Sequence, residues 1–190
     1  GYDVSIDELQ GFDEIIISTG VVPRAINFEV TDSSRIVSYI DILTGNVVAG
    51  KNVAILGAGG IGFDVAQFLI SDQKSSTLDL SKWLQEWGVV DPNVARGGID
   101  PIGYQPRSSS RNVSLFQRKR EKIGRRLGKT TGWIHRESLR KKNVKMISGV
   151  NYEKITPEGL LISFGEEKRD MQLLKVDTII ICAGQISELS

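Results

Sequence analysis

Three glycines at G-x-G-x-x-G spacing form the pattern in this sequence that points most clearly to chemistry. Gly57, Gly59 and Gly62 stand between an apolar run and a segment whose apolar residues recur at helical spacing. In that context the first glycine permits a tight turn, the second lets the backbone approach a pyrophosphate, and the third lets helix and strand pack closely. The helix N-terminus adds free N–H groups. We therefore predict dinucleotide binding, rather than a merely structural turn, by Gly57, Ala58, Gly59, Gly60, Ile61 and Gly62.

The end of the next predicted strand indicates which dinucleotide binds. An Asp or Glu at that position accepts a hydrogen bond from a free ribose 2′-hydroxyl, whereas a 2′-phosphate requires Arg or Lys. Here the strand ends in Gln117, Arg118 and Lys119, without an acid at the critical position. The sequence therefore favours NADP(H) over NAD(H), with a solvated basic run as the alternative interpretation.

Other side chains give weaker signals. Lys129 precedes a predicted helix and is a further candidate for nucleotide contact, while His135, the single histidine, is not favoured as a catalyst. The single cysteine, Cys182, excludes an internal disulfide and an all-cysteine metal or iron–sulfur site, and is interpreted as a small buried hydrophobe. We find no paired carboxylates, serine triad or metal-ligand cluster, and so predict no catalytic and no metal-binding residue.

The elements that would position these residues follow an alternating order. Short apolar runs bounded by breakers are typical of buried parallel strands, and threonine or serine starts favour helices between them. The fold class predicted is α/β, a Rossmann-like parallel sheet with an antiparallel three-stranded meander crossover. The expected strands are 12–20, 52–56, 113–118, 144–148 and 176–184, the helices are 38–45, the segment after Gly59 and 130–143, and the meander spans 152–177.

A long passage, 71–112, interrupts this order and is rich in Gly, Pro and Ser. Loops of this length within a compact domain usually have a function. It contains one predicted helix, 80–87, on which Trp83 and Trp87 share a face. Burial within this excursion is the favoured role for the two tryptophans, and an interface or cofactor-covering role is the alternative.

Composition limits the class of protein and its partners. The chain has 190 residues, 40% of them hydrophobic and 25% charged, as in an ordinary soluble globule. No apolar run is long enough to span a membrane and the N-terminus lacks a secretory pattern, so we expect a cytoplasmic chain without a membrane partner. Half of the basic residues lie between Arg118 and Lys145. Because little aromatic character is interleaved there, a nucleic-acid partner is not favoured.

Five motifs together resemble one enzyme family. The likeness extends over most of the chain and is to the C-terminal part of bacterial NADPH-dependent 2,4-dienoyl-CoA reductases. The glycine turn alone is generic to flavoprotein reductases, whereas LGKTTGWIHR (127–136) and the tryptophan-bearing excursion are more specific to this family. The motifs are GAGGIGFDVA (57–66), KWLQEWG (82–88), QRK (117–119), LGKTTGWIHR (127–136) and VKMISGVNYEKI (144–155).

The resemblance implies a domain of a larger enzyme. Full-length members of that family carry electrons from NADPH to FAD, through a 4Fe-4S cluster to FMN, and then to an unsaturated acyl-CoA in fatty acid oxidation. This chain corresponds to the inserted NADP(H)-binding domain, 38–185, with remnants of the FAD-binding domain at 1–37 and a return segment at 186–190. Its partners would be NADPH and the FAD and barrel domains of the same polypeptide.

By that resemblance the isolated chain is not expected to reduce an acyl-CoA, because the cluster ligands, the barrel and the first glycine turn of the FAD domain are absent from it. A non-catalytic domain that holds an ADP-type nucleotide is the alternative function.

A repeated strand pattern suggests two related domains. FDEIIISTG (12–20) and VDTIIICAG (176–184) share an apolar start, an Asp, three isoleucines and a final glycine. We interpret the first as a strand of the FAD domain and the second as the matching strand of the NADP(H) domain, where the glycine passes close to a cofactor. Ala183 and Gly184 are therefore candidates for the nicotinamide end of the site.

Overall fold

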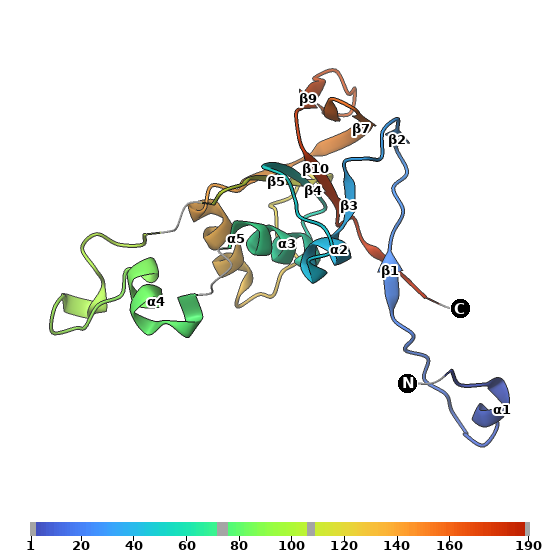
Figure 1. The fold of residues 1–190 in the computed structure, drawn as a ribbon, viewed down its shortest axis with the longest axis horizontal. Helices are drawn as coiled ribbons and strands as arrows, with labels where there is room; N and C mark the ends of the chain where they lie inside the picture. The colour runs from blue at the N-terminus through green and yellow to red at the C-terminus, as the bar shows by residue number, and fades with distance from the viewer. Residues whose placement is uncertain (1–2, 72–75, 106–108, 189–190) are drawn as a thin grey trace.

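A five-stranded parallel sheet forms the centre of the molecule in the computed structural model, which describes residues 3–71, 76–105 and 109–188 (Figure 1). Its strand order is β3-β10-β4-β5-β6, and every neighbouring pair is parallel. All carboxyl ends therefore meet at one edge of the sheet. The strands are β3 (Ile36–Ser38), β4 (Asn52–Leu56), β5 (Asn112–Gln117), β6 (Lys145–Ser148) and β10 (Thr178–Ile181).

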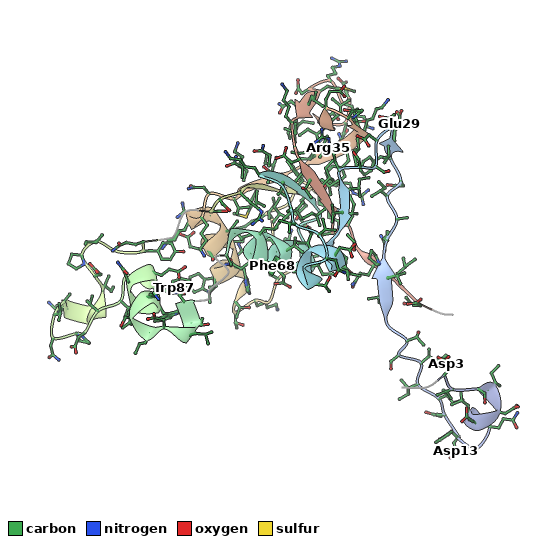
Figure 2. The ribbon with its side chains drawn as sticks, in the orientation of Figure 1. Asp3, Asp13, Glu29, Arg35, Phe68 and Trp87 are labelled. Carbon is green, nitrogen blue, oxygen red and sulfur yellow. The ribbon has the colours of Figure 1, made fainter. Side chains whose placement is uncertain are left out.

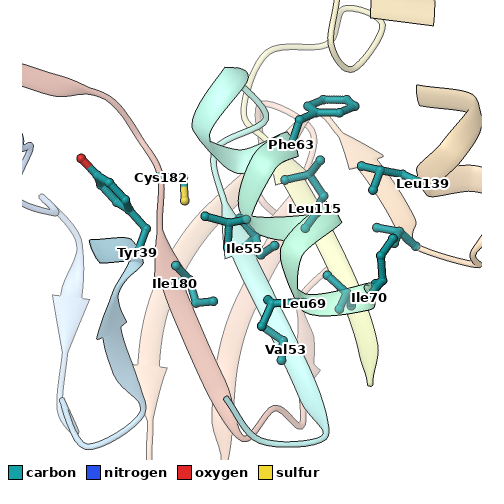
Figure 3. Close-up of a cluster of buried hydrophobic side chains, with 14 of the residues drawn as sticks. Tyr39, Val53, Ile55, Phe63, Leu69, Ile70, Leu115, Leu139, Ile180 and Cys182 are labelled. Carbon is teal, nitrogen blue, oxygen red and sulfur yellow. The ribbon is translucent and has the colours of Figure 1, made fainter. Parts of the chain in front are cut away.

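Three helices cover one face of this sheet, namely α2 (Tyr39–Thr44), α3 (Gly60–Ile70) and α5 (Gly132–Lys141). The predicted limits of α2 are confirmed: the Ser38 hydroxyl accepts a hydrogen bond from the Ile40 N–H, and Gly45 ends the helix in the left-handed region at φ 79°. Between helices and sheet lies an apolar cluster in which Ile55, Leu115 and Ile180 are fully buried (Figure 3).

The predicted antiparallel meander covers the opposite face. It consists of β7 (Val150–Thr156), β8 (Gly159–Phe164) and β9 (Gln172–Leu174), and the short β2 (Glu29–Val30) adds a parallel strand beside β7. A second core cluster joins this meander to the sheet through fully buried residues such as Phe116 and Ile162. The fold is thus the Rossmann-like α/β fold that the sequence predicts, with an antiparallel crossover.

The excursion folds into a unit at the far end of the molecule, beyond α5 (Figure 1). It contains η1 (Ser76–Leu78), the predicted helix α4 (Leu80–Trp87) and η2 (Arg96–Gly98), while 72–75 and 106–108 lie outside the described residues. The Trp83 and Trp87 rings are 6.2 Å apart, and Tyr104 is 5.3 Å from Trp87. The two tryptophans therefore contact each other within the excursion, but Trp83 is only partly buried and Trp87 is 39% exposed, so the burial favoured from the sequence is incomplete.

Two contacts attach the excursion to the end of α5. The Lys142 ammonium lies 3.3 Å from the Glu86 carboxylate, with both side chains about nine-tenths buried, and the Ser76 hydroxyl donates to the same carboxylate at 2.6 Å. The Lys141 ammonium lies 4.3 Å from the centre of the Tyr104 ring, within range of a cation–π contact. Because both charges are buried, removing either partner leaves the other uncompensated, so we expect this to cost more stability than breaking an exposed ion pair.

The segment 12–20 forms no strand, contrary to the prediction from the sequence. Ile15, Ile16 and Ile17 are 51%, 91% and 71% exposed, in an extended arm that follows α1 (Ile6–Leu9). Figure 2 shows Asp3 and Asp13, before and after α1, well away from the sheet. A strand that is buried on both faces needs adjacent strands and elements that cover each face. None of the described residues supplies these for the segment 12–20.

A two-stranded antiparallel ribbon carries the chain into and out of the central sheet. It pairs β1 (Val21–Pro23) with β11 (Gln185–Ser187). Strands β2 and β3, which precede α2, are two and three residues long, too short to give a periodic signal. The described residues contain no helix that is long and apolar enough to cross a membrane.

Replacing Glu86 tests the attachment of the excursion. Glu86→Gln leaves the Lys142 ammonium buried without its counter-charge, so we expect a loss of about 2 kcal/mol in the free energy of unfolding measured with urea. Glu167→Gln is the matched control, because Glu167 pairs with Arg169 at 2.7 Å on the exposed surface. Equal effects of the two substitutions would contradict a stabilising role for the buried pair.

Candidate functional site

A cavity of about 360 Å³ lies at the carboxyl edge of the parallel sheet. In the sheet, β4 has β5 on one side and β10 on the other, and the cavity lies at the carboxyl end of β4. Open α/β sheets bind ligands in the crevice at such a position. The glycine turn, the end of β5 and the end of β10 all reach it. The residues that line it are Arg24, Gly57, Ala58, Gly59, Gln117, Arg118, Lys119, Glu121, Arg125, Arg126, Tyr152, Cys182, Ala183 and Gly184.

Two of the three motif glycines are required by close packing. Gly57 has φ 118°, its N–H donates to the Phe116 carbonyl at 2.9 Å, and a Cβ there would collide with the Cys182 carbonyl. A Cβ on Gly62 would collide with the Gly57 carbonyl. These contacts bring the first turn of α3 directly against the end of β4. Any larger residue at either position would push the helix away from the sheet.

The middle glycine has a different role. Gly59 is the N-cap of α3 in extended conformation, and a Cβ on Gly59 or on Gly60 would meet no atom within 4 Å. The first-turn N–H groups of a helix have no intrahelical acceptor and carry partial positive charge. The open space beside them is a cradle of backbone donors that fits a pyrophosphate. Gly60, Ile61 and Gly62 form the first turn of α3 behind it.

The loop after β5 is shaped by a side-chain amide. Gln117 Nε2 donates to the carbonyls of Lys119 and Glu121, each at 3.0 Å. This folds the chain back at the strand end and places the exposed Arg118 and Lys119 at the cavity. Gln117 therefore shapes the loop through these bonds, and the two basic side chains supply positive charge suited to a phosphate.

The other predicted site residues divide into two groups. Ala183 and Gly184, at the end of β10, line the cavity, and Gly184 has φ 114° with its carbonyl accepting from the Arg24 N–H at 3.0 Å. Lys129 is exposed in the turn before α5 and does not line the cavity among the described residues. His135 is likewise exposed on α5, outside the cavity.

Six of the lining residues were not predicted as site residues, and one of these, Cys182, was interpreted only as a buried hydrophobe. Arg24 directly follows β1 and Tyr152 lies in β7, both distant along the chain from the glycine turn, so no local pattern signals them. Arg125 and Arg126 lie within the basic run, and Glu121 is the acid four residues before Arg125. This spacing of an acid and a base is typical of ion pairs in helices, and it is the one sequence signal that could have indicated Glu121 and Arg125.

Two titratable groups line the cavity in neutral form. Burial raises the pKa of the Tyr152 phenol well above its usual value, more than the nearby Arg118 charge lowers it. Its hydroxyl is buried without a hydrogen-bond partner among the described residues, so it is available as a donor to a ligand. Burial likewise raises the pKa of the Cys182 thiol to about 12. Cys182 packs in the core at 8% exposure, as predicted from the sequence.

A larger hollow of about 620 Å³ lies at the opposite, amino edge of the sheet. Its lining includes Asn52, Asn112, Lys145 and Lys175. No glycine turn or helix N-terminus opens into it among the residues described, and parallel sheets present their ligand sites at the carboxyl ends of the strands. The carboxyl-edge cavity is therefore the better candidate despite its smaller volume.

Alanine substitutions separate the two glycine roles. Gly62→Ala forces a Cβ into the Gly57 carbonyl, so we expect roughly 3 kcal/mol of destabilisation or more in urea unfolding. Gly59→Ala places its Cβ in open space and should cost less than about 1 kcal/mol. Equal losses in the two variants would show that the turn is not packed as described.

The state of Cys182 can be read directly, because it is the single cysteine. With its pKa raised to about 12, the thiol is protonated and covered at pH 8. A disulfide reagent such as Ellman's should therefore modify the native chain at least about a hundredfold more slowly than the chain in guanidinium chloride. Rapid modification of the native chain would contradict the burial.

Comparison with known proteins gives relatives at low identity. A metal reductase of Desulforamulus reducens (strain ATCC BAA-1160 / DSM 100696 / MI-1) is 24% identical over 181 residues, which cover 93% of this chain and 25% of that protein. The chain thus spans about a quarter of the length of this curated relative.

Three solved structures with a similar fold are described as reductases or as a dehydrogenase. A 2-naphthoyl-CoA reductase complex matches with a TM-score of 0.60 and 19% identity, over 88% of this chain and 19% of that chain. Histamine dehydrogenase from Rhizobium sp. 4-9 matches with 0.59 and 12%, over 90% and 22%. Thioredoxin reductase of T. acidophilum matches with 0.52 and 12%, over 89% and 43%. At these identities the likeness concerns the fold.

The family match covers almost the whole chain. The family described as pyridine nucleotide-disulphide oxidoreductase matches residues 5–189, which include the glycine turn, the strand-end loop and the end of β10. This agrees with a nucleotide cavity at the carboxyl edge of a Rossmann-like sheet. The chain belongs to the pyridine nucleotide-disulphide oxidoreductase family.

Proposed function

We propose that this chain is the NADP(H)-binding domain of a larger flavin-dependent oxidoreductase, and that it positions NADPH for hydride transfer to FAD. The observation that carries the proposal is the convergence of the glycine turn and the exposed bases of the β5 end on one cavity. A dinucleotide phosphate presents two kinds of phosphate, and the cavity offers a separate group of donors for each.

Each group of lining residues has a distinct task in this proposal. The first-turn N–H groups of α3 hold the pyrophosphate beside Gly59, and Arg118 and Lys119 hold the 2′-phosphate. Ala183 and Gly184 line the nicotinamide end. The bound nicotinamide supplies the hydride, and the domain supplies binding and orientation. We assign no catalytic residue to the chain.

For the substrate of the whole protein we propose an unsaturated fatty acyl-CoA. The five motifs that resemble 2,4-dienoyl-CoA reductases support this choice, with GKTTGWIHR (128–136) as the narrowest of them. A structure described as a naphthoyl-CoA reductase among the similar folds agrees with a CoA ester. FAD, FMN and a 4Fe-4S cluster would then be held largely by other parts of the longer polypeptide, including the FAD and barrel domains.

Neutralising the two strand-end bases tests the 2′-phosphate assignment. For Arg118→Ala/Lys119→Ala we expect affinity for NADPH to fall by about 10- to 100-fold, because charge-assisted bonds to a phosphate are lost. Affinity for NADH should change by less than about threefold. Isothermal titration calorimetry of the 190-residue chain measures both.

Lys145→Ala/Lys175→Ala is the matched control, because it removes the same charge from the hollow at the amino edge. It should leave both affinities unchanged. Equal affinity of the unsubstituted chain for NADPH and NADH would contradict the 2′-phosphate assignment. Binding of 5′-ADP with no added affinity from the nicotinamide half would favour a non-catalytic nucleotide domain instead.

A further inference from the structure

An acidic side chain lies inside the otherwise basic part of the nucleotide cavity. Glu121 lines the cavity together with Arg118, Lys119, Arg125 and Arg126, and its side chain is 25% exposed. Its carboxylate oxygens lie 3.6 Å from the Arg125 guanidinium and 3.8 Å from the Arg126 guanidinium. One carboxylate thus bridges two arginines at the surface where a phosphate would bind.

A hydrogen bond holds the backbone of Glu121 at the cavity. The Gln117 amide donates to the Glu121 carbonyl at 3.0 Å and so ties residue 121 to the end of β5. The two arginines are largely exposed, at 71% and 73%, whereas Glu121 is mostly covered. The position of the charge pair is therefore set by the Glu121 end, and the arginine side chains are the parts that can turn toward a ligand.

The charges in the cavity make Glu121 a competitor of a bound phosphate for the basic side chains. Without a ligand it offsets the mutual repulsion of the bases that line the cavity. A 2′-phosphate brings a charge of about −1.5 to −2 and binds through the same kind of cation. Glu121 then both repels the phosphate and occupies arginines that would otherwise contact it. A nucleotide with a free 2′-hydroxyl carries no charge at that point and is affected far less.

We propose that Glu121 is a specificity-determining residue that acts as an internal counter-anion, weakening binding of the 2′-phosphate and so limiting the preference of this site for NADP(H) over NAD(H). The inference rests on the proposed function. It assigns Arg125 and Arg126 to the 2′-phosphate alongside Arg118 and Lys119, with Glu121 setting how much of their charge is available to the nucleotide.

The test uses two small probes that differ in the 2′-phosphate alone, 2′,5′-ADP and 5′-ADP, titrated calorimetrically into the 190-residue chain. For Glu121→Gln we expect affinity for 2′,5′-ADP to rise about three- to tenfold, because one negative charge leaves the cavity. Affinity for 5′-ADP should change by less than about twofold. Thermal unfolding of the variant verifies that the fold is intact.

Two comparisons isolate the mechanism. Glu137→Gln makes the same charge change on α5, where Glu137 pairs with the exposed Arg140 at 2.6 Å outside the cavity, and should leave both affinities unchanged. In an Arg125→Ala/Arg126→Ala background, Glu121→Gln should also raise affinity for 2′,5′-ADP, but the fold-increase should be less than half of that in the otherwise unsubstituted chain. A gain of the same size in that background would overturn the arginine-bridging part of the proposal.

The remaining outcomes separate this inference from the function beneath it. If the unsubstituted chain prefers 2′,5′-ADP but Glu121→Gln behaves like Glu137→Gln, the counter-anion role is overturned and the proposed function stands. If Glu121→Gln weakens 5′-ADP, Glu121 instead accepts a hydrogen bond from the ribose 2′-hydroxyl, which also overturns the proposal. If the unsubstituted chain binds neither probe, the proposed function and the inference both fail.

Discussion

The contact between the first turn of α3 and the end of β4 is the constraint on which the site depends. Gly62 packs against the Gly57 carbonyl, and Gly57 in turn packs against the backbone at Cys182, directly after β10. Two backbone-to-backbone contacts therefore bring one helix and two strands together at one point. The open space beside Gly59 exists because its neighbours are packed this closely, so the nucleotide cradle follows from the packing of the sheet edge.

Strand β10 shows how position in the sheet decides the structure of an apolar run. Ile179, Ile180 and Ile181 lie between β3 and β4, with helices on one face and the meander on the other. Ile15, Ile16 and Ile17 have almost the same sequence context but no neighbouring strand among the described residues, and they are exposed. A local apolar pattern therefore predicts a strand correctly only where the fold supplies both partners.

The parts of the site that sequence predicts are those in which the chemistry is local. The glycine turn, the strand-end bases and the caps of α2 each depend on residues a few positions apart, and the structure has these elements where they were expected. Arg24, directly after β1, and Tyr152, in β7, reach the cavity through tertiary pairing, which no local spacing reveals. Glu121 lies beyond the strand end, so the pattern at the strand end does not indicate it, and only the folded loop brings this acid into the same cavity.

The sheet has a hollow at each of two opposite edges, so the claim that the nucleotide binds at the carboxyl edge can be measured directly. Amide chemical shifts of the ¹⁵N-labelled chain, recorded during titration with NADPH, report which edge binds the ligand. The account predicts the largest changes at the backbone N–H groups of Gly59, Gly60 and Ile61, with smaller ones at Arg118 and Lys119. Changes centred on Asn112, Lys145 and Lys175 at the amino edge, with residues 57–62 unaffected, would contradict it.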